Sequence, residues 1–98
     1  MQIATGYTVL DNGTDIALYF PMSAAVVEVN VRADGGAISV RAADGEVVLR
    51  DFPSEVTQAL QHGSVLLVGV DALARPRYAV DVAAGQRVSV AQGSGHAQ

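Results

Sequence analysis

The sequence predicts a mostly β domain, an antiparallel barrel or two-layer sandwich of about eight short strands built from hairpins, with one short helix near residues 55–62. Composition is the first observation behind this prediction, since the apolar half of the chain is mainly valine and alanine with only 5% aromatic residues. Valine is favoured on a pleated sheet because its χ1 angle is restricted. Turn dipeptides that recur roughly every ten residues are the second observation, and this spacing is typical of sandwiches and barrels. Barrel and sandwich remain alternatives.

The length of 98 residues fits one domain with one hydrophobic core. Only 16% of the residues are charged, against about 25% in an average globular domain, so the chain is suited to packing rather than to disorder. We expect a single β domain over residues 1–91 and a flexible Gly/Ser-rich tail over residues 92–98.

The first hairpin is predicted around Asn12-Gly13, a dipeptide that suits a two-residue type I′ turn. This turn places Val9 opposite Ile16 and Tyr7 opposite Leu18, so the large apolar side chains share one face. Pro21 lacks an N–H donor, so the second strand should stop near Phe20 or lie at a sheet edge.

Two Asp-Gly turns, Asp34-Gly35 and Asp44-Gly45, predict a three-stranded meander between residues 25 and 51. If each is a two-residue loop, Val29 lies opposite Val40, and Val40 lies opposite Leu49 on the next strand. One apolar face then extends across all three strands and forms part of the core.

The other face of this meander is predicted to be polar and exposed. Glu28 falls opposite Arg41, and Asn30 falls opposite Ser39 with Arg50 beyond it. Such cross-strand pairs contribute about 0.2–1 kcal/mol each. We expect this face to contact solvent or a polar partner.

One short helix is predicted over about residues 55–62, because Val56, Ala59 and Leu60 follow helical spacing. Ser54 is the expected N-cap and Gly63 the expected stop after the last turn. A helix this short is unstable alone in water, so it should lie on the core as a plug.

The final third of the chain contains a predicted central strand over residues 64–71, apolar without alternation and therefore expected to be covered on both faces. After it, Tyr78 and Val80 alternate with small or polar residues up to a loop at residues 83–85. With Gly85 in the left-handed conformation, this loop predicts a last hairpin in which Val80 faces Val88.

The sequence shows no residue set that a known chemistry requires, so we predict no catalytic residue, cofactor or metal. The chain has no cysteine, and its two histidines lie at the predicted helix end (His62) and in the tail (His96). A triad of Ser64, His62 and Asp71 can be written down, but no G-x-S-x-G motif supports it. Enzymatic activity is therefore only the third hypothesis.

Charge and hydropathy exclude further classes of partner. The six basic residues are all arginine and are scattered, whereas nucleic-acid binding needs them concentrated on one face. No apolar run approaches the roughly 20 residues of a membrane helix, and the first ten residues do not resemble a signal peptide. We expect a cytoplasmic protein without nucleic-acid or membrane partners.

Arg75, Arg77 and Tyr78 form the one local basic cluster and are weak candidates for gripping an anionic ligand or partner. The simpler alternative is a solvated turn with Arg77 paired to a neighbouring acid. Tyr19 is a second weak candidate, at the mouth of a barrel or sandwich.

Surplus apolar surface gives the leading functional hypothesis. A small domain with so few charges cannot bury all of its apolar residues. The predicted registers leave the following residues pointing outward: Ala4, Ala17, Tyr19, Met22 and Val48. We therefore predict a non-catalytic β module acting through protein contacts, a self-associating or assembly subunit, with a small-ligand-binding barrel or sandwich as the alternative.

Overall fold

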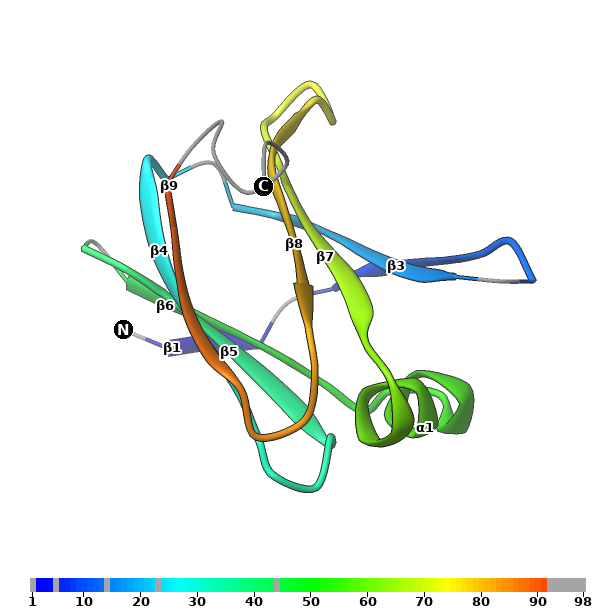
Figure 1. Ribbon diagram of the computed structural model, residues 1–98. Coiled ribbons are helices and arrows are strands. Elements are labelled where there is room, and N and C mark those ends of the chain that lie inside the picture. Colours follow the sequence, from blue (N-terminus) through cyan, green and yellow to red (C-terminus); the bar gives the residue numbers. More distant parts are fainter. Residues whose placement is uncertain (1, 5, 14, 23, 44, 92–98) are drawn as a thin grey trace.

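Two β-sheets packed face to face form the body of the protein, as the computed structural model shows (Figure 1). The structure describes residues 2–4, 6–13, 15–22, 24–43 and 45–91. The five-stranded sheet has the order β1-β6-β5-β4-β9, and the four-stranded sheet has the order β2-β3-β7-β8. The predicted mostly β fold with one helix is confirmed, and the architecture is a two-layer sandwich.

The elements follow one another in this order: β1 (Gln2–Ala4), β2 (Thr8–Asp11), β3 (Ile16–Pro21), β4 (Val26–Val31), β5 (Ala37–Ala42), β6 (Gly45–Arg50), α1 (Ser54–His62), β7 (Val65–Val70), β8 (Pro76–Val82) and β9 (Arg87–Ala91). Most neighbours are antiparallel, but β1 pairs with β6 and β3 pairs with β7 in parallel. The predicted tail lies outside the described residues.

The hydrophobic core lies between the two sheets and consists largely of inward-facing β-branched and aliphatic side chains. Strand β4 shows why, since its valines at alternate positions are buried while the residues between them are exposed. Val29 and Val40, both predicted to be core residues, are fully buried. Phe20 and Tyr78 add an edge-to-face aromatic contact with ring centroids 6.4 Å apart.

The β2–β3 hairpin forms as predicted, but its pairing is offset by two residues. Val9 lies opposite Leu18 rather than Ile16, and the loop has four residues, 12–15. The loop is stabilised by the Asn12 side chain, whose Oδ1 accepts a hydrogen bond from the Asp15 amide at 2.8 Å. An offset of two preserves which face each side chain occupies, so the predicted apolar face survives. Strand β3 ends at Pro21 but is an interior strand, between β2 and β7.

In the meander, the first predicted register is confirmed and the second is wrong. Val29 faces Val40 and Glu28 faces Arg41, as expected for the turn at Asp34-Gly35. Val40 then faces Val47, not Leu49, because the turn between β5 and β6 is centred one residue earlier than predicted. Arg50 consequently lies opposite Ala37 rather than beside Ser39.

Helix α1 covers one end of the sandwich, at the bottom of Figure 1. It begins at Ser54 itself, with Pro53 as the N-cap residue and no side-chain cap, so the predicted Ser54 cap is wrong. Val56 and Leu60 are buried as predicted. Two loops hold the helix in place, since Gln61 Nε2 donates to the Asp34 carbonyl at 2.8 Å and the Ala84 amide donates to the Leu60 carbonyl at 2.9 Å. The helix therefore acts as the predicted plug.

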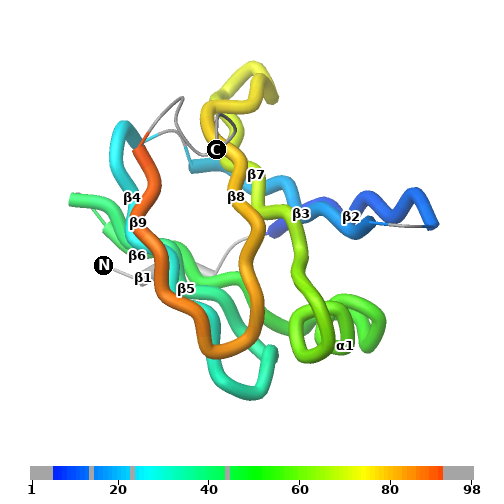
Figure 2. The backbone as a smooth tube through the Cα atoms, viewed as in Figure 1, coloured from blue at the N-terminus to red at the C-terminus, as the bar shows by residue number. Residues whose placement is uncertain are grey.

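Strand β7 is an interior strand between β3 and β8, but the predicted cover on both of its faces is incomplete, since Leu66 is only partly buried. The predicted final hairpin is wrong. Strand β8 pairs with β7, and β9 pairs with β4 in the other sheet. Figure 2 shows β8 and β9 rising on two different walls of the sandwich from a shared loop. Gly85 does adopt a positive φ of 79°, but in a corner between the sheets. A short loop with a left-handed glycine suits a hairpin within one sheet as well as a corner between two sheets. The sequence of the loop therefore cannot distinguish these two connections.

Candidate functional site

The outer face of the four-stranded sheet carries apolar side chains where such a face is usually polar. One row of residues crosses all four strands and consists of Leu10, Ala17, Leu66 and Asp81. The next row consists of Thr8, Tyr19, Val68 and Ala79. In β2 and β3, the outward positions follow from the alternation of side chains along a strand. Val9 and Leu18 point inward, so their neighbours in the chain must point outward. In β7, the lack of alternation places Leu66 and Val68 on this outer face.

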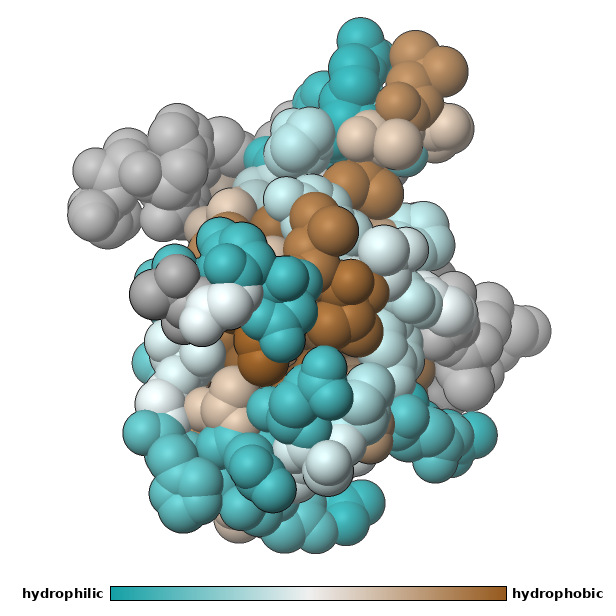
Figure 3. Space-filling view, turned by 90° about the vertical axis from the view of Figure 1, so that its right-hand side faces the viewer, coloured by the Kyte–Doolittle hydropathy of each residue, from teal (hydrophilic) through white to brown (hydrophobic). Residues whose placement is uncertain are grey.

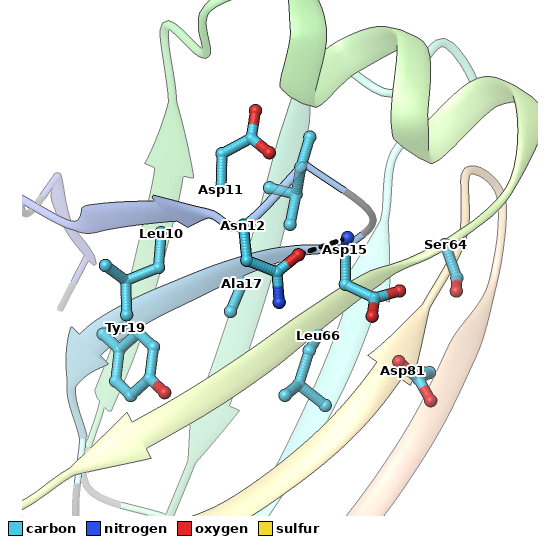
Figure 4. A pocket seen from close by; sticks show the side chains of 10 residues that line it. Leu10, Asp11, Asn12, Asp15, Ala17, Tyr19, Ser64, Leu66 and Asp81 are labelled. Atoms are coloured by element: carbon cyan, nitrogen blue, oxygen red, sulfur yellow. Dashed lines mark hydrogen bonds between the residues drawn. The ribbon is translucent and has the colours of Figure 1, made fainter.

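A hollow of about 550 Å³ lies on this face, at the end nearer the β2–β3 loop. Its residues are Leu10, Asp11, Asn12, Asp15, Ile16, Ala17, Tyr19, Ser64, Leu66 and Asp81. Figure 4 shows Leu10 and Tyr19 at one end of the hollow, with Asp15, Ser64 and Asp81 at the other. The hollow is therefore amphipathic, with an apolar floor and a polar, acidic rim.

The acidic rim is held in shape by the β2–β3 loop. The Asn12 amide donates to the Asp15 carbonyl at 3.2 Å, and the Gly13 amide donates to Asp11 Oδ1 at 2.9 Å. Gly13 adopts a positive φ of 89°, a conformation that other residues reach only at a cost. These bonds fix the backbone that carries Asp11 and Asp15 beside the apolar floor.

The hollow has a negative charge without a compensating cation. Asp15 and Asp81 line it, and so does Asp11, whose carboxylate points away from the floor in Figure 4; among the described residues, no lysine, arginine or histidine lines it. Within the described ranges, the ion pairs join Arg32 to Asp34 and both Arg75 and Arg77 to Asp71, so none involves a rim carboxylate. A cationic group would meet favourable charge here.

The predicted basic cluster is split between a structured turn, which contains Arg75, and strand β8, which contains Arg77. The Asp71 carboxylate accepts hydrogen bonds from the Arg75 amide at 2.9 Å and from Arg75 Nε at 3.0 Å, and it lies 3.9 Å from Arg77 Nη1. These donors, the Arg75 amide first among them, lower the pKa of Asp71 below its ordinary value. The arrangement matches the simpler alternative of arginines paired to a neighbouring acid.

The structure separates Tyr78 from these arginines and places Tyr19 in the hollow. Tyr78 is only 3% exposed and belongs to the core. Its buried hydroxyl has no hydrogen-bond partner among the described residues, and burial raises the pKa of Tyr78. Tyr19 lines the amphipathic hollow, so of the four weak candidates it is the one at the hollow.

The other predicted site residues lie on the outer face of the five-stranded sheet. Glu28, Arg41 and Glu46 form one row across β4, β5 and β6, and the Ser39 hydroxyl donates a hydrogen bond to the Glu46 carboxylate. The Glu28, Arg41 and Arg50 side chains belong to exposed residues. This polar face contrasts with the apolar outer face of the opposite sheet.

The described residues offer no assembled catalytic or metal-binding group. Ser64 precedes β7 and Asp71 follows it, and a strand of six residues spans about 20 Å. The triad written from Ser64, His62 and Asp71 is therefore excluded. Within the same ranges, no group of at least three His, Cys, Asp or Glu side chains could hold a metal ion. His96 lies outside the described residues.

Of the other residues predicted to point outward, some lie on an outer face and others do not. Ala17 and Tyr19 lie on the apolar outer face, and Val48 is half-buried in β6. Met22 packs against the core, so its predicted outward position is wrong. The side chain of Ala4 lies outside what the structure describes.

Compared with protein-family models, with curated proteins and with solved structures, the chain gives no match. In the described part of the chain, no helix has the length and apolar character needed to cross a membrane.

Proposed function

We propose that this protein is a non-catalytic β module that acts through protein contacts, as a self-associating or assembly subunit. The apolar outer face of the four-stranded sheet, with its amphipathic hollow, is the observation that carries the proposal. Leu10 remains 54% exposed on this face, and Ala17, Tyr19 and Leu66 are only partly covered. Apolar surface gathered in this way is typical of interaction sites.

The contrast between the two outer faces supports this choice. The five-stranded sheet presents a row of charged residues to solvent, as a sheet with one solvated face normally does. The outer face of the four-stranded sheet instead carries Leu10, Ala17, Tyr19 and Leu66 at exposed or partly exposed positions, while Val68 in the same face is only 3% exposed. Figure 3 views the side on which the β2–β3 hairpin projects and shows a hydrophobic area with polar surface beside and below it.

The solution mass tests this proposal. Light scattering is measured on the purified chain across dilution from about 100 μM to about 1 μM, which covers micromolar association. We expect an oligomer that dissociates on dilution. Leu10→Lys, which places a charge on the apolar face, should shift the protein to monomer. Ser89→Lys is the matched control, because Ser89 is exposed in β9 and lies opposite Glu28 on the polar face, and it should leave the mass unchanged. A monomer at every concentration contradicts self-association.

A small-ligand module is the second candidate, favoured by the volume of the hollow. About 550 Å³ falls within the range of ligand pockets, which combine apolar walls with a few polar groups. The acidic rim selects a cation with an apolar body. Octylamine is a suitable probe, with octanoate as the control of opposite charge. A saturable rise in melting temperature with octylamine alone, in a chain that stays monomeric, would favour this function over assembly.

A further inference from the structure

The loop between β7 and β8 holds an apolar side chain out in solvent. Leu73 is 71% exposed, more than Leu10 or Val26, the other large hydrophobic residues at the surface of the described chain. Turns of this kind usually carry small or polar residues. An exposed leucine at the tip of a loop is accessible to a partner surface.

The same loop is ordered by its own hydrogen bonds. Asp71 Oδ1 accepts from the Leu73 and Arg75 amides, each at 2.9 Å, and the Asp71 backbone bonds to Ala74 and Arg75. Ala74 adopts a positive φ of 62° to close the turn. Leu73 is thus presented on a pre-organised support, which lowers the entropy lost when such a loop binds.

A cation stands beside this leucine. The Arg75 side chain is 66% exposed, and its Nε is fixed by Asp71 at 3.0 Å. A guanidinium has five N–H donors, so one bond through Nε leaves capacity for a second carboxylate. The loop tip therefore combines an apolar side chain with a positive charge.

These properties are complementary to those of the hollow. The hollow offers Leu10, Ala17 and Leu66 as an apolar floor and Asp15 and Asp81 on its rim, and no basic residue of the described ranges lines it. The apolar Leu73 side chain matches the apolar floor, and the positive charge of Arg75 matches the negative charge of the rim. Paired charges of this kind steer association and fix the orientation of two partners.

One molecule cannot make this contact with itself. The hollow includes Ser64 and Leu66 at the start of β7, whereas the loop begins at Asp71, directly after the strand ends. Six strand residues separate Ser64, at the acidic end of the hollow, from Asp71 by about 20 Å, whereas Tyr19 at the other end of the hollow pairs with Val68 near the end of β7. Figure 1 shows the loop at the end of the sandwich opposite α1. The Arg75 side chain of one copy can therefore reach the acidic end of the hollow only in another copy.

From this complementarity we infer that copies of the chain associate head to tail, the Leu73 loop of one copy entering the hollow of the next with Arg75 facing Asp15 and Asp81. The inference rests on the proposed function and specifies its geometry. Two different surfaces meet in such a contact, so it closes into a ring or continues as a chain of copies. A two-fold symmetric dimer would instead bury the same surface of both copies.

Complementation between two variants tests the inference. Leu73→Asp removes the apolar tip and keeps the hollow, while Leu10→Lys damages the hollow and keeps the tip. Each variant alone should be monomeric by light scattering. An equimolar mixture should form a species of about twice the monomer mass, because one intact tip then meets one intact hollow.

The other outcomes separate the two proposals. If the unmodified chain is monomeric, self-association itself fails. If the chain associates and Leu73→Asp still does so fully, the assembly proposal stands and the head-to-tail contact is overturned. Two monomeric variants that remain monomeric when mixed also overturn it. Thermal melting of each variant checks folding, and Leu73→Ser replaces Leu73→Asp if the latter does not fold.

Discussion

Gly69 in the middle of β7 should not tolerate a side chain. A Cβ atom built at Gly69 would lie 2.3 Å from Tyr78 Cζ and 2.5 Å from its hydroxyl oxygen, since these two residues are opposite each other in β7 and β8. Restoring an ordinary contact of 3.4 Å requires the ring to move by 3.4 − 2.3 = 1.1 Å. Tyr78 is buried and packs against Phe20, so the ring cannot move without disturbing the core.

Gly69→Ala should therefore destabilise the fold. Overpacked cores lose about 1–3 kcal/mol of unfolding free energy, which for a domain of this size lowers the melting temperature by roughly 5–20 °C. Thermal and urea unfolding followed by circular dichroism measure the change. Gly6→Ala is the matched control, because no heavy atom lies within 4 Å of a Cβ built there, and it should change stability by less than about 0.5 kcal/mol.

A double variant checks the cause. Tyr78→Val removes the atoms that the new methyl group would meet, so adding Gly69→Ala to Tyr78→Val should cost much less than Gly69→Ala alone. If Gly69→Ala is as mild as Gly6→Ala, or if its cost is unchanged by Tyr78→Val, the close approach of Tyr78 to β7 is refuted.

Three further predictions concern the core and the β7–β8 loop. Val40→Asp should abolish cooperative melting, because it places an unpaired charge at a fully buried position; a soluble, cooperatively melting variant would contradict this. Tyr78→Phe should raise the unfolding free energy by up to about 1 kcal/mol in urea titrations, since it removes a buried hydroxyl that lacks a partner, and a loss of stability would show that the hydroxyl is satisfied. The lowered pKa of Asp71 means that its carboxylate stabilises the fold above the ordinary aspartate pKa and that this stabilisation is lost as pH falls through the lowered value. Melting temperatures between about pH 6 and pH 2 should thus fall more steeply in the unmodified chain than in Asp71→Asn, and parallel curves would contradict that role.

The sequence predicts most of the strands and the helix because these depend on local patterns. Alternation places Val29 and Val40 in the core whichever turn connects their strands. Where the predicted strands do pair, the two wrong registers, around Asn12 and around Asp44, are offset by two residues, and an even offset leaves every side chain on its predicted face. The face assignments are therefore more robust than the pairings.

The pairing of β8 and the hollow could not be predicted in the same way. The loop at Gly85 suits either a hairpin or a corner, and the choice depends on β7 and β4, which lie far away in the sequence. The hollow depends on this choice, since Asp81 reaches Leu66 only when β8 pairs with β7. One local signal was available, because an isolated glycine within an apolar strand, here Gly69, indicates a close approach by a neighbour.

The sheet order has a consequence for the growing chain on the ribosome. Strand β4 pairs with β5 on one side and with β9 on the other, and β9 is the last described strand. While the chain is synthesised, one edge of β4 stays open until residues 87–91 emerge, and an open edge with apolar valines is a template for pairing with other chains. Alternating charges and polar groups along β4, at Glu28 and Asn30, make that temporary edge less prone to aggregation.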